Sequence, residues 1–291
     1  MGEGFIPEPE ERKTKEQLGF DYFNELLSRS FFQPLSSTGS HFVMHDLIND
    51  LAQFVAGGIC YKLDEKVETN DEYKIPEKAR HASFLRHEYE VFRKFNGFYR
   101  VKGLRTFLPM PVQNIHVWPP FYLSNRILLE LLPKLHRLRV LSLSGYSITE
   151  LPSSICTLIH LRYLNLSGTS IVSLPDSLIN LRHLDNSNTD LLKELPVEIG
   201  KLGSLQSLPK IVLSKVGGLG LRELRNLEHL RGTVAISELQ NVLDVEDAKE
   251  ASVRRKQEIE ELQLTWGNDT DDPRNTRLEE VYWMCYNPMK T

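Results

Sequence analysis

Few residues of this sequence have the types and spacing that catalysis requires. His45 stands directly before Asp46, but no nucleophile is placed for this neighbouring pair, so it does not make a catalytic triad. The stretch Gly217-Gly-Leu-Gly220 lacks the strand–glycine loop–helix frame of a phosphate-binding loop, and no G-x-x-x-x-G-K-[ST] occurs anywhere in the 291 residues. The sequence therefore predicts no catalytic residues and a protein that is not an enzyme.

The cysteines do not have the spacing of a metal site. Cys60, Cys156 and Cys285 are an odd number at wide spacing, and no paired Cys or His motif of the kind that binds zinc is present. We expect no metal and no disulfide framework, which is typical of a reducing compartment. This favours a cytoplasmic location, with the nucleus, or the membrane periphery through partners, as alternatives.

A regular set of residues is better suited to binding than to catalysis. The pattern L-x-x-L-x-L-x-x-x-x-[IL] begins at Leu138, Leu161 and Leu181, and Leu205 opens a fourth copy. The starts are separated by roughly 23, 20 and 24 residues, within the range of about 20–29 known for leucine-rich repeats. Side chains alternate along a strand, so the first, fourth and sixth positions point into a core and the third and fifth point the other way. Such copies stack into a curved solenoid with a parallel sheet on its inner side.

The outward positions of these repeats are predicted to form a protein-binding surface. They are Val140, Ser142, Tyr163, Asn165, His183 and Asp185, and an arginine stands at the second position of each copy, Arg139, Arg162 and Arg182. Stacked guanidinium groups repel one another unless an acidic group meets them. An aromatic ring among arginine and asparagine is typical of the centre of an interface. The alternative, that the arginines only solvate the rim of the solenoid, stays open.

One position departs from the repeat pattern. Asn186 stands where the third copy should have a core leucine. We interpret it as a polar defect in the core, and we expect the substitution Asn186→Leu to be neutral or stabilising.

The segment before the repeats predicts a small unit of helices and a hairpin. Apolar residues at helical spacing favour a helix over 15–30, short strands follow at 31–32 and 41–44, and Asp46 is the expected N-cap of a second helix. Helix, hairpin and helix indicate a winged-helix-like domain. The stretch 46–55 has no Lys or Arg and the formal net charge is −4, so we expect no binding of nucleic acid.

Further strands and helices are expected on both sides of the clear repeats. Strands are expected at 80–85, 103–108, 232–236 and 261–266, and helices at 128–138 and 245–260. The predicted fold class is α/β, a leucine-rich-repeat solenoid preceded by a small winged-helix-like α+β domain. The expected limits are a winged-helix-like domain over 1–63, a linker over 64–79, a repeat domain over 80–268 and a divergent tail over 269–291.

Three motifs carry a resemblance to a known family. Gly4-Phe5-Ile6, the segment from Leu26 to Gln33, and Met44-His45-Asp46-Leu47 resemble the winged-helix segment of plant nucleotide-binding leucine-rich-repeat disease resistance proteins of the coiled-coil subclass. In that family the Met-His-Asp triplet is a switch motif, and its histidine reaches the phosphates of bound ADP. The resemblance implies this role for His45, with Met44 and Asp46 beside it.

The rest of that nucleotide pocket is missing from the sequence. The full-length family binds ADP or ATP, but without a phosphate-binding loop we expect no cofactor in this chain. We favour the simpler interpretation that His45 packs in front of a helix N-terminus, since a site must be argued from its own residues.

The resemblance also implies a role in plant innate immunity. The chain is interpreted as the C-terminal part of a receptor, whose repeats hold the nucleotide-binding domain inactive and recognise a pathogen effector or a guarded host protein. A stand-alone scaffold or decoy, or a truncated gene product without function, are the alternatives, and the missing phosphate loop argues against a nucleotide hydrolase. No run of about 18 apolar residues occurs, so no membrane span is expected.

Overall fold

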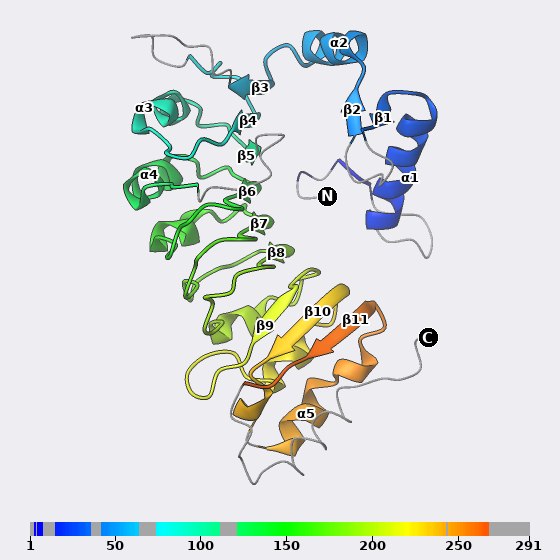
Figure 1. Cartoon of the computed structure of the whole chain (residues 1–291), viewed down its shortest axis with the longest axis vertical. Coiled ribbons are helices and arrows are strands. Elements are labelled where there is room, and N and C mark those ends of the chain that lie inside the picture. The colour runs from blue at the N-terminus through cyan, green and yellow to red at the C-terminus, as the bar shows by residue number, and fades with distance from the viewer. Residues whose placement is uncertain are drawn as a thin grey trace.

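The computed structural model describes residues 3, 5–7, 15–35, 42–63, 74–110, 121–242 and 244–267. A curved stack of strands runs along the long axis, with helices on its outer side, and a small N-terminal unit lies on the side of the strands (Figure 1). The expected tail at 269–291, most of the expected linker and Cys285 lie outside the described residues.

The N-terminal unit is a helix, a hairpin and a second helix. The elements are α1 (Lys15–Ser28), β1 (Phe32–Pro34) and β2 (Phe42–Met44), which pair antiparallel, and α2 (Asp46–Ala56). The ring of Phe23 in α1 packs against those of Phe32 and Phe42, with centroids 5.4 and 4.8 Å apart. These ring contacts join the first helix to the hairpin. The arrangement is the winged-helix-like unit that the sequence predicts.

The N-cap of α2 is His45. The sequence analysis predicted Asp46 instead, and that prediction is wrong. His45 has φ −59° and ψ 140°, outside the helical range, and its Nδ1 accepts a hydrogen bond from the backbone N–H of Leu47 at 3.2 Å. Asp46 is already in the first helical turn, where its carboxylate lies near the positive end of the helix dipole. The helix ends at Gly57, whose φ of 54° is a left-handed conformation that glycine adopts readily.

The solenoid begins one strand earlier than expected. Its first sheet has six parallel strands, in the order β3 (Cys60–Leu63), β4 (His81–Leu85), β5 (Thr106–Met110), β6 (Val140–Ser142), β7 (Tyr163–Asn165) and β8 (His183–Asp185). β3 falls in the range 1–63 that we assigned to the winged-helix-like domain, yet it pairs with β4. The domain limits stay a proposal, and pairing assigns residues 60–63 to the solenoid sheet.

A second, three-stranded parallel sheet continues the stack. It consists of β9 (Lys210–Val212), β10 (Gly232–Ser237) and β11 (Ile259–Leu264). The α-helices of the solenoid are α3 (Phe92–Phe95), α4 (Asn125–Leu131) and α5 (Val245–Ala251). Short 3-10 turns lie at Asn96–Arg100, Leu132–Lys134, Ser153–Thr157, Val197–Lys201, Arg222–Asn226, Leu239–Asn241 and Val253–Arg255.

Two helices differ from their predicted ranges. The helix expected over 128–138 begins at Asn125 and gives way at Leu132 to a 3-10 turn that contains Pro133, which has no N–H for a helical bond. The helix expected over 245–260 stops at Ala251, because Ser252 takes a left-handed φ of 52°.

Leucines of the repeats form the core, as the strand alternation predicts. Leu141, Leu143, Leu164 and Leu166 are at most 1% exposed. After each clear repeat strand the chain turns through a residue with positive φ, at Gly145, Gly168 and Asn188. Glycine and asparagine tolerate this conformation, which explains why these residue types recur there.

Asn186 is a core residue with hydrogen-bond partners, so our interpretation of it as a polar defect is wrong, and with it the basis of our expectation for Asn186→Leu. The residue is 0% exposed, its Nδ2 donates to the backbone carbonyl of Lys210 at 2.7 Å, and its Oδ1 accepts from the backbone N–H of Lys210 at 3.1 Å. At the junction between β8 and β9, the side-chain amide of Asn186 thus makes two hydrogen bonds to Lys210 of the kind that a neighbouring strand would make. A leucine would leave both backbone groups of Lys210 without these bonds.

A buried ionic cluster fixes the outer side of the first solenoid turns. Lys94 of α3 pairs with Glu90 at 2.7 Å, and their side chains are 5% and 0% exposed. Glu90 also accepts a hydrogen bond from the hydroxyl of Tyr146 at 2.7 Å, and Arg86 donates to the backbone carbonyl of Ser144. Burial, and then the charge of Glu90, raise the pKa of Tyr146 well above its usual range. This cluster, which we call the Glu90 cluster, ties β4 and α3 to the turn after β6.

Candidate functional site

The concave face carries one column of side chains in strand register. His81 of β4 lies beside Thr106 of β5, Thr106 beside Val140 of β6, and the register continues through Tyr163 and His183 to an isolated bridge at Ser207. We call these residues the central column. All of them are half-buried, and the rings of Tyr163 and His183 have centroids 6.0 Å apart. The sequence placed Val140, Tyr163 and His183 on this face.

A column of arginines runs beside the central column. Its members are Arg80, Arg105, Arg139, Arg162, Arg182 and Arg231, which we call the arginine column. The backbone carbonyl of each of the first four accepts a hydrogen bond from the N–H of the next, and Gln206 fills the place between Arg182 and Arg231 in the same ladder. The sequence predicted Arg139, Arg162 and Arg182. The other three were missed because the degenerate repeats lack the L-x-x-L pattern.

The arginine column concentrates positive charge along one edge of the concave face. Neighbouring strands lie about 4.8 Å apart, so stacked guanidinium groups interact with one another. Burial, and then the charges of Arg182 and Arg139, lower the pKa of Arg162. Among the described residues, Arg139 has a carboxylate oxygen of Glu3 at 4.0 Å, and no carboxylate lies that close to Arg162 or Arg182.

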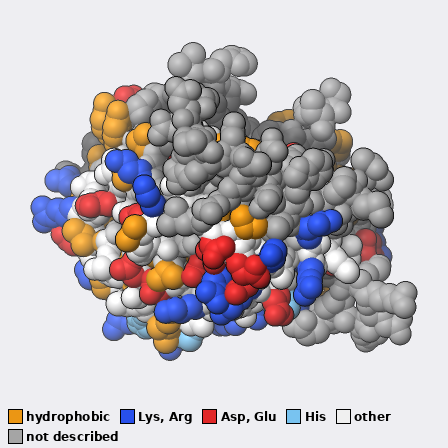
Figure 2. Space-filling view, turned by 90° about the horizontal axis from the view of Figure 1, so that it is seen from below, with side chains coloured by type: hydrophobic (Ala, Val, Ile, Leu, Met, Phe, Trp, Pro, Cys, Tyr) orange, Lys and Arg blue, Asp and Glu red, His pale blue; other side chains and the backbone are white. Residues whose placement is uncertain are grey.

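Elsewhere on the solenoid, basic side chains are interleaved with acidic ones. Seen from the β11 end, the described surface carries Lys and Arg next to Asp and Glu (Figure 2). Glu250 of α5, for example, pairs with Arg222 at 2.6 Å and with Arg225 at 3.1 Å. Exposed pairs of this kind add little stability, but they neutralise charge locally. The middle of the arginine column lacks this neutralisation within the described part of the chain.

The fifth repeat positions hold the turns that follow the strands. Oδ1 of Asn165 accepts from the backbone N–H of Ser167 at 2.8 Å, and Oδ1 of Asp185 accepts from that of Ser187 at 3.1 Å. Ser142 is only 2% exposed. It is therefore not on an accessible surface, contrary to our prediction, because the backbone turns back at Ser144, whose hydroxyl lies 3.2 Å from that of Ser142.

A groove of about 710 Å³ lies between the concave face and the N-terminal unit. The central column from Thr106 to Ser207 lines it, together with Glu3 and Phe5 of the N-terminal segment and Gln17 of α1. Arg231, Glu258 and Glu260 lie along its far end. The groove is therefore a mixed surface, lined by apolar and aromatic groups, by Arg231 and by the carboxylates of Glu3, Glu258 and Glu260.

His45 belongs to the N-terminal unit and not to this face. Its Nδ1 is occupied in capping α2, so a neutral ring carries its proton on Nε2, and the residue is exposed. Met44 ends β2, and Asp46 begins α2. The sequence contains no phosphate-binding loop whose lysine could act together with this exposed imidazole. The switch role of His45 stays a prediction.

Across the described ranges, no group of three or more His, Cys, Asp or Glu is arranged to hold a metal ion. No helix in the same part of the chain has the length and apolar character needed to cross a membrane. Cys60 is exposed, Cys156 is half-buried, and both are free thiols.

A winged-helix unit followed by a leucine-rich solenoid defines the class of protein. Residues 1–52 match the disease resistance protein winged helix domain, and residues 118–289 match the leucine-rich repeat region. The chain belongs to the plant disease resistance proteins with leucine-rich repeats, and it carries their winged-helix and repeat regions.

Its relatives are disease resistance proteins of two plants. One from Arabidopsis thaliana is 39% identical over 292 residues, which cover 91% of this chain and 20% of the relative. The disease resistance RPP13-like protein 1 of the same plant is 36% identical over a stretch that covers 97% of this chain and 29% of the relative. Disease resistance protein RGA2 of Solanum bulbocastanum is 32% identical over a stretch that covers 87% of this chain and 25% of the relative. The chain thus spans less than a third of the length of these relatives.

Proposed function

We propose that this chain is the winged-helix and repeat part of a plant immune receptor, and that its concave face binds other proteins. The arginine column beside the central column carries the proposal. Guanidinium groups on successive turns repel one another, and a partner with acidic groups would relieve that repulsion through paired hydrogen bonds. Tyr163, half-buried near the middle of the central column, offers an aromatic anchor of the kind that dominates binding energy.

Two kinds of partner fit this surface. Within a receptor, the partner is the nucleotide-binding domain, which the repeats hold inactive. Between molecules, it is a pathogen effector or a guarded host protein. The defence role of the relatives supports both, and both place the chain in the cytoplasm. A scaffold or decoy without a nucleotide switch, and a product without function, are the competing proposals.

The test is co-precipitation of the full chain with a nucleotide-binding domain of this family supplied in trans. The double variant Arg162→Glu with Tyr163→Ala is expected to lose association while keeping its thermal melting temperature, because both side chains are half-buried on the face and outside the leucine core. Arg137→Glu, at an exposed arginine of the same solenoid outside the column, is the matched control and should associate normally.

Unchanged association of the double variant would move the partner surface away from the concave face. Binding of an effector by the wild-type chain, with no binding of any nucleotide-binding domain, would favour the scaffold or decoy instead.

A further inference from the structure

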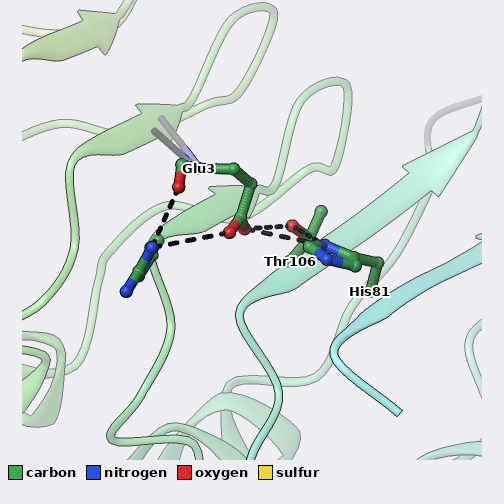
Figure 3. Close-up of polar contacts among 4 residues, drawn as sticks. Glu3, His81 and Thr106 are labelled. Atoms are coloured by element: carbon green, nitrogen blue, oxygen red, sulfur yellow. Dashed lines mark hydrogen bonds and ion pairs between the residues drawn. The ribbon is translucent and has the colours of Figure 1, made fainter. Parts of the chain in front are cut away.

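We propose that His81, Thr106 and Arg139 form a carboxylate-binding site on the concave face, and that Glu3 of the chain's own N-terminal segment occupies it (Figure 3). The inference rests on the proposed function, because it takes the concave face as the binding surface. It adds the chemical class of group that the face recognises, and an internal residue that competes for it.

The contacts of Glu3 involve its side chain and its backbone. The hydroxyl of Thr106 donates to Oε1 of Glu3 at 2.5 Å, and Nη1 of Arg139 donates to the backbone carbonyl of Glu3 at 2.9 Å. The same Nη1 lies 4.0 Å from Oε2, and Nδ1 of His81 lies 3.7 Å from Oε1. The side chain of Glu3 is 11% exposed, so these contacts are largely removed from water.

The hydrogen bonds fix where the protons lie. A threonine hydroxyl has one proton, and here Thr106 donates it to the carboxylate. Its oxygen must then accept from Nδ1 of His81, which lies 2.9 Å away, so Nδ1 carries a proton. His81 therefore orients the hydroxyl toward an anion, and the site is polarised for a carboxylate.

The charges around the site favour an anion over a neutral ligand. Arg80, Arg105 and Arg139 all act on His81, as does Glu3. Within the described part of the chain, three guanidinium groups and one carboxylate, that of Glu3, act on His81. A neutral amide of the same shape would keep one hydrogen bond and lose the attraction to the arginines.

Glu3 fills this site incompletely. Its Oε2 is buried yet has no hydrogen-bond partner within the described residues, and Arg139 reaches it only at ion-pair distance. A buried oxygen without a donor weakens the internal contact. An acidic segment of a partner that offers better geometry can therefore displace Glu3 from the solenoid.

The test uses the full chain with a fluorescent dye on its N-terminal amine, two residues before Glu3 in the sequence. Steady-state anisotropy reports how firmly the segment is held. Glu3→Gln removes the charge of the hydrogen bond and Thr106→Val removes its donor. Each should lower the anisotropy, and the segment's dissociation equilibrium should rise by about tenfold, as expected when a charge-assisted hydrogen bond is weakened or lost. The double variant should fall by less than the sum of the two single effects, because both changes act on the same contact.

Two further variants keep the test specific. Thr106→Ser retains the hydroxyl and should keep the anisotropy of the wild type. Thr233→Val is the matched control. It removes a threonine of β10 whose hydroxyl lies 3.4 Å from the carboxylate of Glu261 on β11, away from Glu3, and it should have no effect. Unchanged anisotropy in Glu3→Gln, or an equal loss in Thr233→Val, overturns the proposal.

The two proposals fail separately. If the anisotropy does not respond while Arg162→Glu with Tyr163→Ala still loses its partner, the internal carboxylate site is wrong and the binding face stands. If the anisotropy responds as expected while that double variant keeps its partner, the site exists but the binding face lies elsewhere.

Discussion

Asn186 is a single residue on which the junction of the two sheets depends. Its amide replaces two strand hydrogen bonds to Lys210 in a position with 0% exposure. Asn186→Leu should therefore lower the free energy of unfolding by about 1–3 kcal/mol, the cost of leaving buried backbone groups unpaired. Urea unfolding followed by circular dichroism measures this. Asn226→Leu, at an exposed position of the solenoid, should change stability by less than about 0.5 kcal/mol. A stabilised Asn186→Leu would contradict the role of the amide.

His81 gives the chain a dependence on pH. Burial, followed by the charges of Arg105, Arg139 and Arg80, lowers its pKa below 6.5, although Glu3 acts in the opposite direction. The folded chain thus favours the neutral ring. As pH falls below 6.5 the unfolded chain takes up a proton at this residue before the folded chain does, so stability is lost toward acid pH.

We expect His81→Asn to reduce that acid-side loss. Asparagine retains a donor near the position of Nδ1 but does not titrate. The measurement is the change in urea midpoint between pH 7.5 and pH 5.5, which should be smaller in His81→Asn than in the wild type. His136→Asn, at an exposed histidine of the same solenoid, is the control and should leave the wild-type difference in place.

At the scale of elements, the Glu90 cluster holds α3 and β4 to the turn after β6. Lys94 and Glu90 are both nearly inaccessible to water, so removing one charge leaves the other buried without its partner. Glu90→Gln should cost on the order of 3–5 kcal/mol. Arg126 and Glu130 of α4 form a pair with the same four-residue spacing at an exposed site. Glu130→Gln should therefore cost less than about 1 kcal/mol. Equal losses in the two variants would show that burial does not set the energy of the pair.

The strands also explain why the arginines align. Each arginine from Arg80 to Arg182 immediately precedes a residue of the central column, and parallel pairing repeats that offset from turn to turn. A residue type that recurs at one repeat position therefore becomes a line on the surface. The same logic makes the fifth positions a line of turn-forming side chains, with Asn165 and Asp185 as members.

At the scale of the whole molecule, we expect the chain by itself to bind neither ADP nor ATP. His45 is the one residue that matches the family's phosphate contact, and its Nδ1 already caps α2. Without the backbone cradle and lysine of a phosphate-binding loop, one imidazole cannot hold a triphosphate. Titration of the purified chain with labelled ADP should show no saturable binding in the micromolar range. Saturable micromolar binding that His45→Ala removes would disprove this.

The sequence by itself determined the repeat, the inward leucines and the face on which Tyr163 and the middle arginines lie. These features follow from the period of side-chain direction along a strand, which is local and repeats without reference to the rest of the chain. The helix–hairpin–helix unit is local in the same way, because apolar spacing and turn residues specify it within about 40 residues.

Only the tertiary structure decided which polar groups meet. Asn186 depends on a backbone 24 residues away, and Glu3 depends on Thr106 and Arg139, which follow it by 103 and 136 residues. β3 belongs to the solenoid because it pairs with β4. Ser142 is buried where the chain turns back at Ser144. Hydrogen bonds and ion pairs require two groups within a few ångström, and sequence spacing does not state that distance for residues in different turns.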